Sequence, residues 1–240
     1  MKRTPCIVAM GGGGFSMEPG NPLLDDYILS LTGKREPRVC FVATASGDSR
    51  EYIARFYEAF TPRACRPSHL TFFERTVQDL RAFILPQDVV YVGGGSTANM
   101  LAVWRLHGLD AVLRDAWQRG TVLCGLSAGS ICWYEAGLTD SFGGLDPFRD
   151  GLGLLPGSHC PHYDGESKRQ AVYEALIAKG ALPDGIAADD GVGLRYAGTE
   201  LAEAVSSRPG ARAWRVERSE LGSRRTELVP RYLGQREAGP

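Results

Sequence analysis

The sequence lacks a long apolar run, an excess of charge of either sign and any closely spaced pair of cysteines. A helix that crosses a bilayer needs about 20 consecutive apolar residues, and no stretch here approaches that length. The 27 basic and 28 acidic residues leave a net charge of −1. Such a balance lacks the excess of positive charge that binds nucleic acid or an anionic membrane, so we expect neither as a partner.

None of the six cysteines forms a Cys-x-x-Cys motif. Cys6, Cys40 and Cys124 fall inside predicted strands, where cysteine behaves as a small apolar residue. A reduced, cytoplasmic protein is the simplest interpretation. The first residues, "MKRTPCIVAMGGGG", are basic and then apolar. Their apolar part, "CIVAM", is shorter than the roughly 7–15 residues of a signal-peptide core, so we expect a first strand there.

Short apolar runs alternate with amphipathic ones along the first half of the chain. The predicted strands are 6–12, 38–44, 68–73, 88–95 and 121–126, and the predicted helices are 22–33, 49–60, 76–85, 97–108, 109–120 and 128–137. This alternation indicates a parallel sheet with helices on both faces. Beyond it, one clear helix, 166–180, lies among short β-type runs. Because no repeat, low-complexity segment or linker is found, we expect a single domain over 1–240, frayed from about residue 234.

Glycine-rich turns follow three of the predicted strands, at 11–14, 93–95 and 125–129. In parallel sheets, ligands bind beyond the carboxyl ends of the strands. The third turn, "GLSAG", matches the G-x-S-x-G nucleophile elbow and lies between a strand and a helix. Such a turn lifts the Ser127 hydroxyl out of the sheet, while N–H groups at the helix start point toward a forming oxyanion. Ser127 is therefore the candidate nucleophile, and a packed Gly/Ser turn is the structural alternative.

The turn "GGGSTA" (93–98) fits a dinucleotide-binding fingerprint, G-x-G-x-x-A. The next strand should then end in an acidic residue for the ribose hydroxyls, but strand 121–125 ends in Cys124 and Gly125. A better interpretation is that a glycine N–H of this turn supplies an oxyanion donor opposite the N–H of Ala128. We expect no nucleotide or other cofactor.

A nucleophilic serine needs a general base, and the chain has only four histidines. His69, near a strand start, and His107, at a helix end, are interpreted as structural. His159 and His162 lie in "PGSHCPHYDGE" (156–166), which we predict to be an irregular loop, where catalytic residues concentrate. A metal site at "HCPH" is disfavoured, because a proline separates the ligands and no other Cys/His cluster completes a set.

The candidate acids are Asp189 and Asp190 in "ADDGVG", which follows a predicted strand, and Asp140 in "TDSFGG". Side chains alternate along an extended strand, so Asp189 and Asp190 cannot both face His162. The order serine, histidine, acid differs from that of ordinary α/β-hydrolases, in which the acid precedes the histidine.

Together, the "GGGST" turn, the "GLSAG" elbow and the "PH" followed by a "GES" helix start resemble peptidase family S51 over roughly residues 5–200. This family includes peptidase E, an α-aspartyl dipeptidase, and more distantly cyanophycinase. The resemblance implies an α/β fold of the class I glutamine amidotransferase type. This fold is a three-layer sandwich around a mostly parallel, flavodoxin-like sheet. It also implies a Ser-His-acid hydrolase that needs no metal.

The resemblance also implies roles for individual residues. Ser127 would be the nucleophile, His162 the base and Asp190 the acid, with Gly94, Gly95 and Ala128 around the oxyanion hole and Lys168 and Ser96 in contact with substrate. Asp190 stands where peptidase E has Glu, and we expect its carboxylate within about 3.2 Å of His162 Nδ1. Asp140 is the alternative acid. Lys168 stands where aspartyl dipeptidases carry Arg, and the loop before it is shorter. Because Lys cannot replace a bidentate Arg, a preference for N-terminal Asp is not expected to carry over.

The expected function is that of a cytoplasmic serine peptidase acting on short peptides. One alternative is a cyanophycinase-like hydrolase of β-Asp-Arg peptides, or an acyl hydrolase with another leaving group. Another is a non-catalytic binding protein of the amidotransferase fold. An amidotransferase itself is disfavoured, because Ser127 stands where its cysteine nucleophile would be. A homodimer or a larger homo-oligomer remains open.

Overall fold

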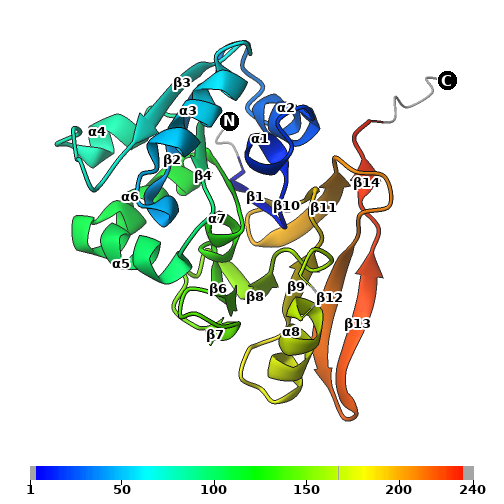
Figure 1. Ribbon diagram of the computed structural model, residues 1–240. Helices are drawn as coiled ribbons and strands as arrows, with labels where there is room; N and C mark the ends of the chain where they lie inside the picture. Colours follow the sequence, from blue (N-terminus) through cyan, green and yellow to red (C-terminus); the bar gives the residue numbers. More distant parts are fainter. Residues whose placement is uncertain (1–3, 167, 235–240) are drawn as a thin grey trace.

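The computed structural model describes residues 4–166 and 168–234, which form two β-sheets and the helices packed on them (Figure 1). The larger sheet has the strand order β14-β11-β10-β1-β5-β4-β2-β3, and the smaller sheet has the order β13-β12-β9-β8-β6-β7. The large sheet contains β1 (Cys6–Met10), β2 (Arg38–Val42), β3 (Arg66–Leu70), β4 (Val89–Val92), β5 (Val122–Leu126), β10 (Val192–Ala197), β11 (Glu200–Ser206) and β14 (Arg231–Tyr232). The small sheet contains β6 (Tyr134–Thr139), β7 (Asp146–Phe148), β8 (Leu155–Cys160), β9 (Gly185–Ala188), β12 (Ala213–Ser219) and β13 (Gly222–Leu228).

The helices are α1 (Gly14–Met17), α2 (Leu23–Ser30), α3 (Arg50–Phe60), α4 (Leu80–Ile84), α5 (Thr97–His107), α6 (Leu109–Gln118), α7 (Ala128–Ile131) and α8 (Arg169–Ala178), with a 3-10 turn, η1 (Thr44–Ser46). Strands β1, β5, β4, β2 and β3 run parallel, as the alternation of strands and helices predicted. No helix of the described residues is both long and apolar enough to cross a membrane.

The parallel strands are buried on both faces. Along β1, Ile7 and Ala9 belong to one core cluster, whereas Val8 and Met10 belong to another. The first cluster includes Trp104 of α5 and also residues of α6, and the second includes residues of α2 and α3. Helices therefore cover both faces of the parallel strands, which accounts for their near-continuous apolar sequences. This arrangement confirms the predicted three-layer α/β fold.

No second sheet was predicted, although β9 and β12 coincide with two of the predicted β-type runs, and several element boundaries were wrong because of it. The predicted helix 128–137 is only the short α7, after which the chain enters β6. Gly137 packs so closely there that a Cβ would lie 2.8 Å from the carbonyl oxygen of His159. The predicted loop 156–166 likewise begins inside β8.

Other boundaries were wrong for local reasons. Helix α4 begins at Leu80 rather than at 76, because the side chain of Asp79 caps it by accepting the N–H of Ala82 at 2.9 Å. Helix α8 begins at Arg169 rather than at 166. The predicted frayed tail lies, from residue 235 on, outside the described residues.

Candidate active site

Ser127 lies on a strained turn between β5 and α7. Its backbone has φ 55° and ψ −120°, a conformation that non-glycine residues rarely adopt and that costs about 1–3 kcal/mol. A Cβ on Gly125 would overlap the carbonyl oxygen of Gly129, and a Cβ on Gly129 would overlap that of Val92. The sharp turn therefore requires both glycines of the "GLSAG" motif. It leaves the serine half-buried at the carboxyl end of the sheet.

His162 faces Asp190, with His162 Nδ1 2.6 Å from Asp190 Oδ1. Their side chains are only 14% and 13% exposed. The carboxylate accepts the Nδ1–H, so the neutral imidazole presents an unprotonated Nε2, which is what a general base requires. His162 too has a positive φ, of 54°. Its main-chain N–H donates to the carbonyl oxygen of Gly11 at 3.0 Å, and the N–H of Asp190 donates to Asp164 Oδ1 at 2.9 Å.

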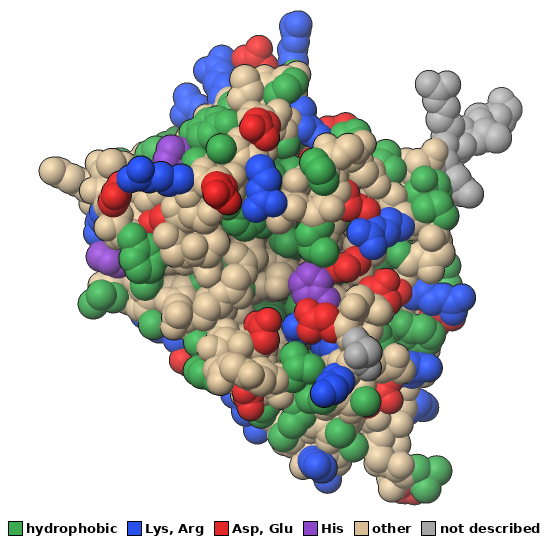
Figure 2. Space-filling view, in the orientation of Figure 1, with side chains coloured by type: hydrophobic (Ala, Val, Ile, Leu, Met, Phe, Trp, Pro, Cys, Tyr) green, Lys and Arg blue, Asp and Glu red, His purple; other side chains and the backbone are tan. Residues whose placement is uncertain are grey.

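The order of the strands brings these groups to one edge of the large sheet. Strands β1, β5 and β4 are consecutive neighbours, spaced about 4.8 Å apart. Gly12 follows β1, and a Cβ there would lie 3.0 Å from His162 Nδ1 and would overlap Asp190. Ser127 follows β5, and Gly94 follows β4, where a Cβ would lie 3.3 Å from that of Ser127. Figure 2 shows a hollow near the centre of one face of the molecule, with a histidine and several acidic side chains beside it.

The histidine–aspartate pair comes from the sheet that was not predicted. His162 follows β8 and Asp190 follows β9, and these two strands are parallel neighbours in the small sheet. Main-chain hydrogen bonds join their loops to the turn after β1, because the N–H of Gly191 also donates to the carbonyl oxygen of Gly12, at 3.1 Å. The small sheet thus brings the pair to the strand next to β5.

The "GGGST" turn lies on the other side of Ser127. Gly95 has φ 137°, and a Cβ there would overlap the carbonyl oxygen of Ala45, so only glycine fits. The N–H of Gly94 donates to Tyr52 Oη over a long 3.3 Å. Ala128 is the first residue of α7, where an N–H has no acceptor within the helix. Ser96 caps α5, because its Oγ accepts the N–H of Asn99 at 3.3 Å.

The other candidate acids are arranged differently. Asp189 is buried, its Oδ2 accepts the N–H of Arg212 at 2.9 Å, and burial raises the pKa of its carboxyl to about 6. Asp140 is exposed in the turn after β6. Of the three candidate acids, Asp190 has a carboxylate oxygen at hydrogen-bonding distance from His162 Nδ1 within residues 4–166 and 168–234.

His159 is a core residue of β8, not a loop residue as predicted. Its Nδ1 lies 2.8 Å from the carbonyl oxygen of Ile186, and its ring stacks on Tyr134 with centroids 4.9 Å apart. Burial lowers the pKa of this imidazole to about 3, so it is neutral. The described residues hold no group of three or more histidine, cysteine or acidic side chains that could bind a metal.

Lys168 is exposed just before α8, and the neighbouring Arg169 is 2% exposed. The Arg169 guanidinium donates through Nε to Glu166 Oε2 at 2.9 Å, and its Nη2 lies 2.9 Å from the same oxygen. Sequence reasoning missed this ion pair, which joins the buried Arg169 to the exposed Glu166. The i,i+3 spacing of Glu166 and Arg169 could have indicated it.

A serine on a strained elbow in this sandwich, beside a histidine–aspartate pair, is the arrangement of a serine-type hydrolase. The model of peptidase family S51 matches residues 7–204, so the chain belongs to this family and is a peptidase. It is 51% identical over 228 residues to the uncharacterized peptidase YgaJ of Bacillus subtilis (strain 168), an alignment covering 95% of this chain and 99% of that protein. It is 29% identical to peptidase E of Salmonella arizonae, over 61% of this chain and 67% of that protein. Its fold is similar to the crystal structure of a peptidase from an acI-B1 Actinobacterium, with a TM-score of 0.69 at 15% identity, covering 95% of this chain and 96% of that one.

Proposed function

We propose that this protein is a cytoplasmic serine peptidase that hydrolyses short peptides with Ser127, His162 and Asp190 as its triad. The observation that carries the proposal is the 2.6 Å contact between His162 Nδ1 and Asp190, beside the elbow of Ser127. A triad is recognised by geometry and roles rather than by the order of its residues in the chain. The order serine, histidine, acid is therefore no obstacle.

In the proposed reaction, Ser127 Oγ attacks the carbonyl carbon of the scissile bond while His162 Nε2 takes its proton. The histidine then gives that proton to the leaving amine, and an acyl-enzyme remains on the serine. Water, deprotonated by His162, then attacks the ester carbonyl carbon, the bond to Ser127 Oγ breaks, and His162 returns the proton to that oxygen as the acid product leaves. Asp190 stays ionised throughout, holds the imidazole in the required tautomer and stabilises its charged form.

The negative oxygen that forms during each attack needs N–H donors that are already in place. In our proposal these are the N–H of Ala128 and that of Gly94 or Gly95. Gly95 is exposed, and the Gly94 N–H makes only a 3.3 Å bond to Tyr52, which a stronger anionic acceptor can displace. The fixed backbone of both turns supports this assignment, because the donors need no rearrangement.

Substrate selection would involve Lys168 and Ser96, near the start of α8 and of α5. Lys168 offers a point charge rather than the planar fork of an arginine. The adjacent Arg169 is buried and already paired with Glu166, so its guanidinium is not available to bind a substrate carboxylate instead. We therefore propose a broader preference than one for N-terminal Asp.

The test combines labelling with a cleavage screen. A fluorophosphonate probe should label the wild-type protein at Ser127, which peptide mass spectrometry can locate. Ser127→Ala should abolish labelling, and Ser30→Ala, a control on the surface of α2, should not. Dipeptides, tripeptides and a β-Asp-Arg polymer are then offered. Cleavage of the polymer alone would assign the chain to the cyanophycinase-like alternative, and absence of both labelling and cleavage would favour a binding protein.

A further inference from the structure

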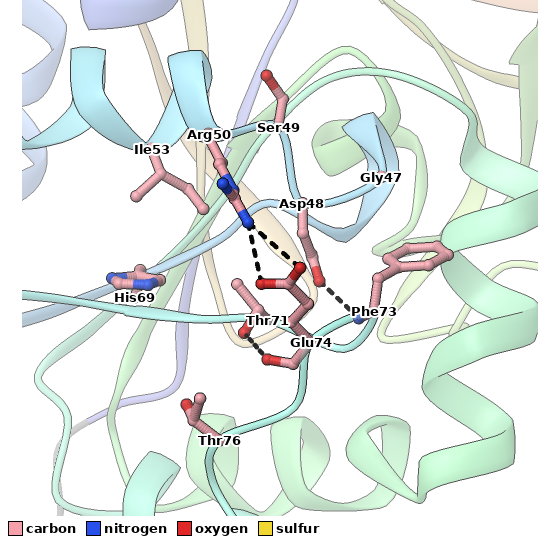
Figure 3. Close-up of a pocket in the computed structure, with 10 residues that line it drawn as sticks. All are labelled: Gly47, Asp48, Ser49, Arg50, Ile53, His69, Thr71, Phe73, Glu74 and Thr76. Atoms are coloured by element: carbon pink, nitrogen blue, oxygen red, sulfur yellow. Dashed lines mark hydrogen bonds and ion pairs between the residues drawn. The ribbon is translucent and has the colours of Figure 1, made fainter.

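A pocket of about 500 Å³ lies between two loops at the carboxyl ends of β2 and β3. Figure 3 shows the residues that line the two walls: Gly47, Asp48, Ser49, Arg50 and Ile53 on one side, and His69, Thr71, Phe73, Glu74 and Thr76 on the other. Nothing in the proposed reaction uses this pocket.

The pocket lies on the same edge of the sheet as the elbow. Strand β4 lies between β5 and β2, and β3 follows β2. The N–H of Ser96 donates to the carbonyl oxygen of Ala45 at 2.8 Å, which joins the "GGGST" turn to the loop that continues into the pocket wall at Gly47. At about 4.8 Å per strand, two to three strands separate Ser127 from the pocket, or roughly 10–14 Å. An extended peptide covers that distance in about three or four residues.

The two walls are held together by Asp48. Its Oδ2 accepts the N–H of Phe73 at 2.8 Å and also the N–H of Phe72. Asp48 has φ 56°, and the other non-glycine residues with positive φ in the described chain are Ser127 and His162. Backbone strain of this kind concentrates at catalytic sites and ligand clamps. The pocket is thus a pre-formed feature of the edge rather than a gap between independent loops.

The charged groups in its walls are paired or buried within the protein. Arg50 and Glu74 pair at 3.2 Å. Asp48 Oδ2 accepts backbone N–H groups, and Asp48 Oδ1, which has no hydrogen-bond partner among the described residues, is buried and so is not presented to a ligand. The remaining wall includes Ile53 and Phe73, and Phe73 is 61% exposed. A ligand carboxylate or ammonium would compete with the exposed Arg50–Glu74 pair, whereas an apolar side chain would cover exposed apolar surface. The pocket chemistry therefore favours an uncharged side chain.

The direction of the peptide follows from the position of the base. His162 must reach the leaving amine, and it lies at the end of β1, on the opposite side of Ser127 from the pocket. The acyl part of the substrate then extends toward β4 and β2. We propose that the pocket receives an aromatic or branched aliphatic side chain from a residue about three or four positions N-terminal to the bond that is cut. This inference rests on the proposed peptidase function and extends it to substrates longer than dipeptides.

Hydrolysis provides the first test. A dipeptide that the enzyme cleaves is extended at its N-terminus with alanines to six residues, with Phe, Ala or Asp placed three or four positions before the bond. Wild-type kcat/KM should be about 5- to 20-fold higher with Phe than with Ala, mainly through KM, and lowest with Asp. Phe73→Ala should remove the gain from Phe while dipeptide cleavage stays unchanged. Leu221→Ala, which removes a fully exposed leucine from the distant β12–β13 hairpin, should retain it.

Binding to the Ser127→Ala protein separates this inference from the proposed function. Calorimetry should give a lower Kd for the Phe hexapeptide than for the Ala hexapeptide, and Phe73→Ala in the same background should abolish the difference. That result would support binding of the Phe side chain in the pocket even if no peptide is hydrolysed. In that case only the proposed peptidase function would be wrong. Equal Kd values for the two hexapeptides would overturn the inference. So would a higher kcat/KM only for peptides extended at their C-terminus, or a lower kcat/KM of Phe73→Ala on dipeptides as well.

Discussion

Replacing Asp190 by Asn tests the proposed triad most directly. The amide has nearly the shape of the carboxylate, so the fold should be retained. The carboxylate oxygen 2.6 Å from His162 Nδ1 would, however, be exchanged for an amide group. An amide N–H directed at Nδ1 would hold the other tautomer, with the proton on Nε2, and the base could no longer accept the serine proton. In serine proteases of known mechanism, this change lowers kcat by about 10⁴, and we expect a similar loss here.

Two matched variants make the result specific. Asp189→Asn introduces the same change one residue earlier, at a buried carboxyl that accepts the N–H of Arg212. Asp140→Asn introduces it at the exposed alternative acid. Steady-state kcat on a cleaved dipeptide should fall only for Asp190→Asn, with thermal unfolding curves showing that each variant is folded. If Asp190→Asn keeps kcat within tenfold of wild type while Asp140→Asn loses it, the acid has been wrongly assigned.

Four further outcomes are expected. Ser127→Ala should lower kcat by several orders of magnitude without lowering Tm, and near-wild-type turnover would contradict the serine mechanism. Asp-Leu should be a poorer substrate than Leu-Leu or Ala-Leu, and Lys168→Arg should raise its kcat/KM by about tenfold; a strong preference of the wild type for Asp would contradict this. Gly12→Ala should displace Asp190 and reduce kcat, whereas Gly20→Ala, with open space at its Cβ, should not. Burial raises the pKa of Asp25 from 3.8 to about 7, so the folded state holds a proton that the unfolded chain releases. Stability should therefore fall as the pH rises through this interval, and denaturation curves of Asp25→Asn should show a smaller fall.

The parts of the site that could be predicted depend on local sequence. The elbow of Ser127 could be predicted from the five-residue "GLSAG" motif, although only part of its steric cause is local: a Cβ on Gly125 would overlap the carbonyl oxygen of Gly129, whereas a Cβ on Gly129 would overlap that of Val92 in β4. The parallel strands were predicted because burial on both faces makes them continuously apolar. These signals require no knowledge of which distant segments pair.

The small sheet depends on pairing between distant segments, and for that reason it was missed. Its strands β6 and β8 contain glycine and polar residues. From sequence alone, β6 was therefore predicted as the end of a helix and β8 as part of a loop. Within "SHCPH", the sequence cannot tell which histidine is buried. The register of β8 against β9 decides this by placing His159 opposite Ile186, while Pro161 begins the loop that carries His162. The helix predicted for 128–137 extended too far, past the end of α7, for the same reason.

The two sheets therefore divide the proposed chemistry between them. The large sheet supplies Ser127 and the glycine turn beside it, each fixed by parallel strands with covered faces. The small sheet supplies His162 and Asp190 from the ends of two parallel strands, and hydrogen bonds to Gly11 and Gly12 join them to the large sheet. Turnover then depends on how accurately the sheets are held together. This explains why the turn after β1, which contributes no side chain to the reaction, must be glycine: a Cβ on Gly11 would overlap the backbone of Ala188 and Asp189, and one on Gly12 would overlap the Asp190 carboxylate itself.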